Sequence, residues 1–322
     1  MYSAIRPADA DAGSQGSQRG GTPVVALTLM LVLVGLEASP APAAPARHAH
    51  AFWKGIVDHG YAVPAGESPA ALIEELSGYL GSPDRQLRDD FAYAIPVHWI
   101  YFDKRLAPGE LQALLQLWSA NLEVGLGETG TDTVLLRSFS TLDLSILAAL
   151  DNERPFLTDA EFQGLLALGL RYLAKERDVR GYDERVGWIH ATAHTADLLK
   201  FLSRNTKLKS TDQKWIIEGI AAKLEGAGSV FTHGEDERLA RALLSLARRP
   251  DFDPSSLLAW CRRLKAAETS LLDAPVFDHD RFIALQNEKN SLKSLAVLLS
   301  AEKDPSAAAR EVATSLLAVL VG

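Results

Sequence analysis

The chain has 322 residues, 47% of them hydrophobic, which supplies enough apolar surface for one large domain or two ordinary ones. Its formal net charge is −8, and its short basic stretches lie on predicted helices that also carry acidic residues. Proteins that bind nucleic acid usually show a clustered basic excess, so we expect no nucleic-acid partner. Because Cys261 is the only cysteine, an intramolecular disulfide is excluded.

The first fifty residues have the composition of a leader. Residues 9–21 are small and polar, and the apolar run at 23–36 is shorter than the roughly 20 residues that span a bilayer. An Ala-x-Ala pattern follows at 41–43, as at a signal peptidase site. We therefore predict a signal peptide with a polar leader over residues 1–44 and a periplasmic or secreted mature protein. The alternative is an uncleaved leader that anchors the chain to the inner membrane, which would be its only membrane contact.

Beyond the leader, apolar residues recur every three or four positions, and strand-like alternation is scarce, so helices are expected to dominate. Capping signals at Ser68-Pro69, at 158–161 and at 210–213 mark three helix starts. Pro96 is predicted to break or kink the third helix. The predicted helices cover residues 51–59, 68–80, 83–103, 108–124, 132–150, 158–176, 185–203, 210–225, 235–248, 254–267, 278–300 and 305–320.

Helix pairs recur at intervals of roughly 40 to 52 residues, near the period of helical-hairpin arrays. The sequence therefore predicts an all-α fold, either a HEAT-like α-solenoid or a stack of helical hairpins. We predict a single domain over residues 45–322, in which the residues after about 272 are a candidate C-terminal helical extension.

The segment from residue 178 to 201 is the most informative, because a polar loop leads directly into an apolar helix. At 100° per residue, His190, His194, Asp197 and Phe201 share one helix face. Two histidines four residues apart can bind one divalent metal ion such as zinc, and Asp197 could be a third ligand or orient His194. The glutamate of an HExxH zinc motif is absent between them.

Three interpretations of this stripe stay open. Buried polar groups need partners, so the most frequent arrangement of this kind is a structural hydrogen-bonded network. The second interpretation is a metal site, and the third is general acid–base chemistry without metal. A purely structural role predicts that His194→Ala lowers thermal stability without changing any binding.

Other charged residues are candidates for the same site. Acids at 235–237 begin a predicted helix, where they would offset the helix dipole, but Glu235 or Asp236 could instead turn toward the histidine stripe. Arg137 lies in an apolar helix and needs a carboxylate or an anionic ligand. The predicted ligand-binding residues are Arg137, Arg180, Asp197, Glu235 and Asp236.

Several catalytic motifs are absent from the sequence. It contains no glycine-rich phosphate loop, no GxSxG nucleophile elbow and no dinucleotide fingerprint. Phosphoryl transfer through a P-loop and hydride transfer on a Rossmann domain are therefore not expected.

Five segments together resemble a bacterial family known as domain of unknown function 2785: LRDDFAY at 87–93, RSFS at 137–140, RGY at 180–182, GWIHATAHTAD at 187–197 and GEDERLA at 234–240. The resemblance covers roughly residues 65–265. It implies an α-helical, repeat-like fold, and it brings no activity, substrate or catalytic residue.

The leading hypothesis is an exported helical-repeat protein that binds a protein or small-molecule ligand on a concave face. That face would be lined by His190, His194, Asp197, Arg137 and Glu235. The alternative is a metal-dependent hydrolase, in which the histidines are ligands and Asp197 or Glu235 completes the site or activates water.

Overall fold

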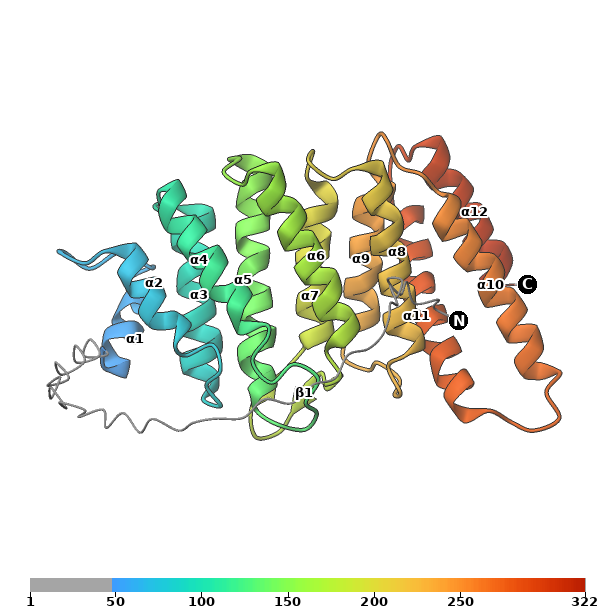
Figure 1. Ribbon diagram of the computed structural model, residues 1–322, viewed down its shortest axis with the longest axis horizontal. Helices are drawn as coiled ribbons and strands as arrows, with labels where there is room; N and C mark the ends of the chain where they lie inside the picture. Colours follow the sequence, from blue (N-terminus) through green and yellow to red (C-terminus); the bar gives the residue numbers. More distant parts are fainter. Residues whose placement is uncertain (1–47, 322) are drawn as a thin grey trace, which may run out of the picture. The chain divides into compact units, whose positions relative to one another are not determined.

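The computed structural model describes residues 48–321 (Figure 1). Helices account for 68% of this part of the chain, and its only strands are one two-stranded pair. The predicted all-α class is therefore confirmed, whereas the assignment to HEAT-like repeats stays a prediction. The predicted signal peptide, residues 1–44, lies outside the described residues.

In chain order, the elements are α1 (His50–Asp58), α2 (Pro69–Ser77), η1 (Gln86–Tyr93), α3 (Ala94–Pro96), η2 (Val97–Phe102), α4 (Pro108–Asn121), α5 (Thr133–Glu153), α6 (Asp159–Lys175), β1 (Tyr182–Asp183), β2 (Gly187–Trp188), α7 (Ala191–Arg204), α8 (Ser210–Glu225), α9 (Glu235–Ala247), α10 (Ser255–Leu272), α11 (His279–Ser300) and α12 (Ala307–Val321).

Two of the three predicted helix starts form as expected. The Ser68 hydroxyl accepts the Ala71 N–H before α2. At α6, Thr158 and Glu161 exchange side-chain and backbone hydrogen bonds, which satisfies two N–H groups that the helix leaves unpaired. The third start is shifted by one residue, because the Asp212 carboxylate accepts the N–H of Lys209.

Of the break or kink predicted at Pro96, the break does not occur. The chain stays helical there, with φ −55° and ψ −39°. The segments on both sides, η1 and η2, have wide π-helical turns, and the Asp103 N–H bonds the His98 carbonyl five residues back at 2.8 Å. A wide turn moves the preceding carbonyl away from the proline ring, which relieves the clash that would break an α-helix.

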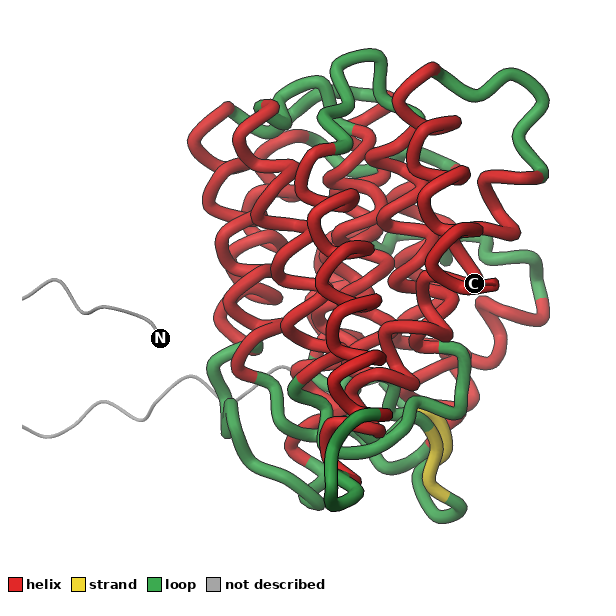
Figure 2. The backbone as a smooth tube through the Cα atoms, turned by 90° about the vertical axis from the view of Figure 1, so that its right-hand side faces the viewer, coloured by secondary structure: helices red, strands yellow, loops and turns green. Residues whose placement is uncertain are grey.

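Helices that are two apart in the sequence lie side by side. α5 packs on α7, α7 on α9 and α9 on α11, and Figure 1 shows this row running from green to orange. The alternate helices flank the row: α4 packs on α5, α6 on α7 and α8, and α10 on α11 and α12. Figure 2 shows the loops gathered at the two ends of the helices, with the strand pair at one end. This order places the loops before α5, α7 and α9 near one another.

The helix α5 forms the centre of the core. It is long and apolar enough to cross a membrane by length and composition, but 89% of its most apolar stretch is buried inside the protein, as in the core helix of a globular domain. The core continues past residue 272, because α11 packs on α8 and α9, and Leu292 and Leu316 belong to the same buried cluster. The candidate C-terminal extension therefore packs against the preceding helices.

Candidate binding site

The helix α7 begins later than predicted. The expected helix started at residue 185, whereas α7 starts at Ala191, and the β1–β2 hairpin precedes it. The Asp183 carboxylate accepts the N–H groups of two of the three turn residues, Arg185 and Val186, at 2.9 and 3.1 Å. A buried guanidinium from η1, that of Arg88, donates to the Val186 carbonyl at 2.8 Å. These contacts hold the hairpin, and they place its last residues against the start of α7.

His190 caps α7 from the left-handed conformation, with φ 50° and ψ 30°. Such a backbone is uncommon outside glycine and persists where surrounding contacts fix it. Here the His190 N–H donates to the Gly181 carbonyl at 3.2 Å, and the ring stacks on Trp188 with centroids 4.4 Å apart. The His190 and His194 rings lie 5.9 Å apart, so the two histidines are neighbours although His190 precedes the helix.

The protonation of His194 follows from its partner. The Ser138 hydroxyl on α5 donates its only proton to the Ile189 carbonyl, so Nδ1 of His194 must donate to the Ser138 oxygen, 2.8 Å away. In the neutral ring, Nε2 is then a hydrogen-bond acceptor. Burial, reinforced by the neighbouring His190 and Arg238, lowers the pKa of His194 well below its usual 6.5. The buried ring is therefore neutral at pH 7.

Glu235 is the acid that turns inward. It is buried, and its Oε2 accepts the His233 N–H at 2.9 Å. Its Oε1 lies 3.7 Å from Nε2 of His190 and has no hydrogen-bond partner among the described residues. His190 Nε2 instead lies 3.1 Å from the His233 carbonyl, to which it donates as a neutral ring. Burial lowers the pKa of His190, and the nearby Glu235 carboxylate partly opposes that shift. The next residue, Asp236, is partly exposed.

Asp197 is already held by two cations. One oxygen accepts from Lys200 at 2.8 Å, and the other pairs with Arg238 of α9. In residues 48–321, no three His, Cys, Asp or Glu side chains are grouped so that they could hold a metal ion. The metal site of His190, His194 and Asp197 therefore stays a prediction.

Two residues near this group were missed by the sequence reasoning. Asp143 of α5 is fully buried, and within the described part of the chain neither of its oxygens has a hydrogen-bond partner, so burial raises its pKa well above the usual value. Burial, Asp143 and Asp197 together raise the pKa of Tyr93 to about 12, while Arg238 lowers it. The electrostatic contributions of Asp143 and Asp197 indicate that Tyr93 lies near both carboxyl groups. The only sequence signal was a lone acid within the apolar centre of α5.

Two predicted ligand-binding residues are engaged elsewhere. Arg137 is fully buried, and its Nε donates to Glu176 at 2.6 Å while Nη1 donates to a loop carbonyl at 2.8 Å. Arg180 pairs with Asp178 at 2.6 Å, within the loop before the hairpin. The anionic partner expected for Arg137 is thus a protein carboxylate. Its guanidinium faces Glu176, whereas the next residue, Ser138, contacts His194.

Together, the side chains from η1, α5, α7 and α9 form what we call the polar cluster: Tyr93, Asp143, His190, His194, Asp197, Glu235 and Arg238. Both histidines and Tyr93 are neutral at pH 7, and Asp197 is neutralised by its cations. The free hydrogen-bonding capacity lies on the carboxyl of Asp143 and on Oε1 of Glu235. These oxygens are therefore the acceptors of the polar cluster that the described residues leave unused.

The comparison with known families agrees with the sequence resemblance but shifts its limits. Residues 122–297, more than half of the chain, match a family described as "Protein of unknown function (DUF2785)". The match starts later than the expected residue 65 and extends past 265 into α11, and it includes every member of the polar cluster except Tyr93. No curated protein and no solved structure matches the chain. The chain therefore belongs to the DUF2785 family.

Proposed function

We propose that this protein binds a small ligand rich in hydrogen-bond donors at the polar cluster. The observation that carries the proposal is the pair of buried carboxyl groups, Asp143 and Glu235, with oxygens that no described residue satisfies. Leaving a buried polar group unpaired costs about 1–3 kcal/mol, and a bound donor would recover that cost. Hydroxyl, amine and amide groups provide such donors.

The neighbouring contacts support a preorganised site. Ser138 fixes the tautomer of His194, and the stacking on Trp188 fixes the ring of His190. Arg238 ties α9 to α7 through Asp197. Because these side chains are already ordered, a ligand would lose little further side-chain entropy on binding.

The proposal is tested by thermal unfolding in the presence of polyols, amines and amides, each as a separate class. A ligand that binds only the folded state raises the midpoint, with about 2.7 kcal/mol of stabilisation at one hundred times its Kd. We expect one class to raise the midpoint of the wild type, and Asp143→Ala and Glu235→Gln to reduce this shift. Asp236→Asn, at the same helix start, is the matched control that keeps it.

Two results would contradict binding at the polar cluster. One is that no ligand class raises the unfolding midpoint of the wild type, and the other is that a ligand raises the midpoint of every variant as much as that of the wild type. Elemental analysis of the same protein checks the metal alternative, since stoichiometric metal that is lost in His190→Ala/His194→Ala would indicate a metal site.

We also propose that the chain is exported to the periplasm or secreted. The support is the apolar run at 23–36 followed by the small residues at 41–43. Intact-mass analysis after expression in a bacterium should find an N-terminus near residue 44 or 45. An intact N-terminus in the membrane fraction would instead support the inner-membrane anchor.

A further inference from the structure

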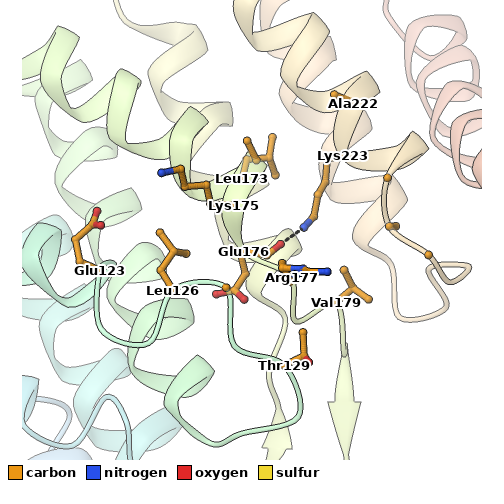
Figure 3. Close-up of a pocket in the computed structure, with 15 residues that line it drawn as sticks. Glu123, Leu126, Thr129, Leu173, Lys175, Glu176, Arg177, Val179, Ala222 and Lys223 are labelled. Atoms are coloured by element: carbon orange, nitrogen blue, oxygen red, sulfur yellow. Dashed lines mark hydrogen bonds between the residues drawn. The ribbon is translucent and has the colours of Figure 1, made fainter. Parts of the chain in front are cut away.

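A cavity of about 890 Å³ lies at the loop end of α6 and α8, and we call it the Lys223 pocket (Figure 3). Its walls come from three segments that are distant in the sequence: the loop after α4 (123–129), the end of α6 with the loop that follows (173–179), and the end of α8 with the loop that follows (222–228). Its volume is within the range of small-molecule sites, roughly 300–1,000 Å³.

The carboxylates on the pocket wall already have partners. Glu176 is buried and binds Arg137 through both oxygens, at 2.6 and 3.2 Å. Glu123 pairs with Arg171 of α6. Neither acid is therefore available to neutralise a further positive charge in the pocket.

The cations on the wall, in contrast, have no carboxylate partner. Lys175 and Arg177 are exposed, and neither forms an ion pair with any residue that the structure describes. Lys223 is buried and donates one hydrogen bond, to the Glu176 carbonyl at 2.6 Å. Figure 3 shows Lys223 reaching from α8 to the end of α6, with Arg177 drawn beside this contact. In a chain of net charge −8, this pocket carries unpaired positive charge.

Lys223 is suited to receive an anion. Burial lowers its pKa to about 8, and Glu176 and Asp178 limit that shift, so the ammonium is mostly charged at pH 7. An ammonium has three donors, and the protein accepts one of them here. Charge-assisted hydrogen bonds from such a group are stronger than neutral ones.

The remaining wall is largely apolar or small, including Leu126, Leu173 and Val179. A pocket that joins apolar walls to unpaired cations fits an amphipathic anion better than an inorganic one. We propose that the Lys223 pocket binds a small organic carboxylate, whose anionic group contacts Lys223 and Arg177 and whose hydrocarbon part lies against the leucines and the valine. This site is separate from the polar cluster.

The test is isothermal titration of the full-length protein with octanoate and, separately, with inorganic phosphate. We expect octanoate to bind the wild type more tightly than phosphate does. Arg177→Gln and Lys223→Met should each weaken octanoate binding at least about tenfold, the effect of losing a charge-assisted hydrogen bond. Lys214→Met, on the exposed face of the same helix, is the matched control that retains binding.

Lys223 also donates to the carbonyl of Glu176, the residue that follows α6, so Lys223→Met can lower stability by itself. Arg177→Gln leaves that contact intact and keeps the test valid. As a second measurement, octanoate should protect the Lys223 amine from reductive methylation, followed by peptide mass spectrometry. The proposal is overturned if octanoate does not bind the wild type, if both variants bind octanoate as tightly as the wild type does, or if phosphate binds as tightly as octanoate.

Discussion

Two buried ionisable residues on the same helix have opposite surroundings. Arg137 and Asp143 both lie in α5 and are fully buried. Arg137 donates to Glu176, to the Val124 carbonyl and to Thr133. Asp143 has no hydrogen-bond partner among residues 48–321.

The difference separates a structural role from a candidate binding role. A buried charge is tolerated when a partner of opposite charge and good geometry compensates the lost hydration. Arg137 meets that condition within the protein and fixes the end of α6 to α5. Asp143 does not meet it, so burial raises the pKa of its carboxyl, and neither oxygen has a hydrogen-bond partner among the described residues.

The largest effect is expected from breaking the satisfied pair. Arg137→Met leaves Glu176 buried without its cation, which should lower the free energy of unfolding by about 3–5 kcal/mol. Urea denaturation followed by circular dichroism measures the loss. The double variant Arg137→Met/Glu176→Met should recover most of it, because neither charge of the pair is then left buried alone. If the double variant is as unstable as the single one, packing rather than charge determines the effect.

The unsatisfied residue predicts an opposite, pH-dependent effect. The folded pKa of Asp143 is raised, so between the unfolded value of 3.8 and the folded value the folded state holds more protons. The wild type therefore loses stability as the pH rises through this window, by up to about 1.4 kcal/mol per pH unit. The Asp143→Asn variant lacks this loss. The difference in unfolding free energy between the variant and the wild type should therefore increase from pH 4 to pH 7. A difference that stays constant over this range would contradict a raised pKa of Asp143.

His194 is intermediate between Arg137, which is fully paired, and Asp143, which has no partner. It has one side-chain hydrogen bond, and its pKa is lowered. Below pH 6.5 the unfolded chain binds a proton that the folded ring excludes, so wild-type stability falls as the pH decreases through this range. His194→Gln should reduce the slope between pH 6.5 and 5, measured by urea denaturation at each pH. His190 contributes a slope of the same sign in both proteins. An unchanged slope in the variant would show that His194 does not titrate in this way.

The smallest change in unfolding free energy is expected from breaking an ion pair that is exposed to solvent. Lys54 and Asp58 form an exposed pair one turn apart on α1, with side chains about half accessible. Lys54→Ala should change the unfolding free energy by less than about 0.5 kcal/mol. A loss comparable to that of Arg137→Met would mean that burial is not what distinguishes the pairs.

Much of the fold could be predicted from local sequence. Apolar spacing and capping residues located the helices from α1 to α12, because an amphipathic stripe and a cap are local properties. The exceptions depend on distant contacts. The late start of α7 depends on the hairpin that Arg88 of η1 holds through the Val186 carbonyl, and continuity through Pro96 depends on wide turns that no propensity indicates.

The candidate site was only partly predictable, for a related reason. His190 lies beside His194, as the sequence suggested, but it precedes α7 in a left-handed conformation, so a shared helix face is not what brings the two rings together. Helical spacing could not show that Glu235 rather than Asp236 turns inward, because that depends on how α9 packs against α7. The partner of Arg137 comes from the end of α6, and the missing partner of Asp143 becomes apparent only when every neighbouring helix is in place.

The close approach at Gly181 has an evolutionary consequence. A Cβ at this position would lie 2.4 Å from Oε1 of Glu235 and 2.6 Å from Cβ of His233, so a side chain there would displace the acid. Drift at position 181 is therefore constrained by the residues at 233 and 235. Among homologous chains, a side chain at 181 should occur only together with smaller residues at the other two positions, and an alignment in which the three vary independently would contradict this close packing.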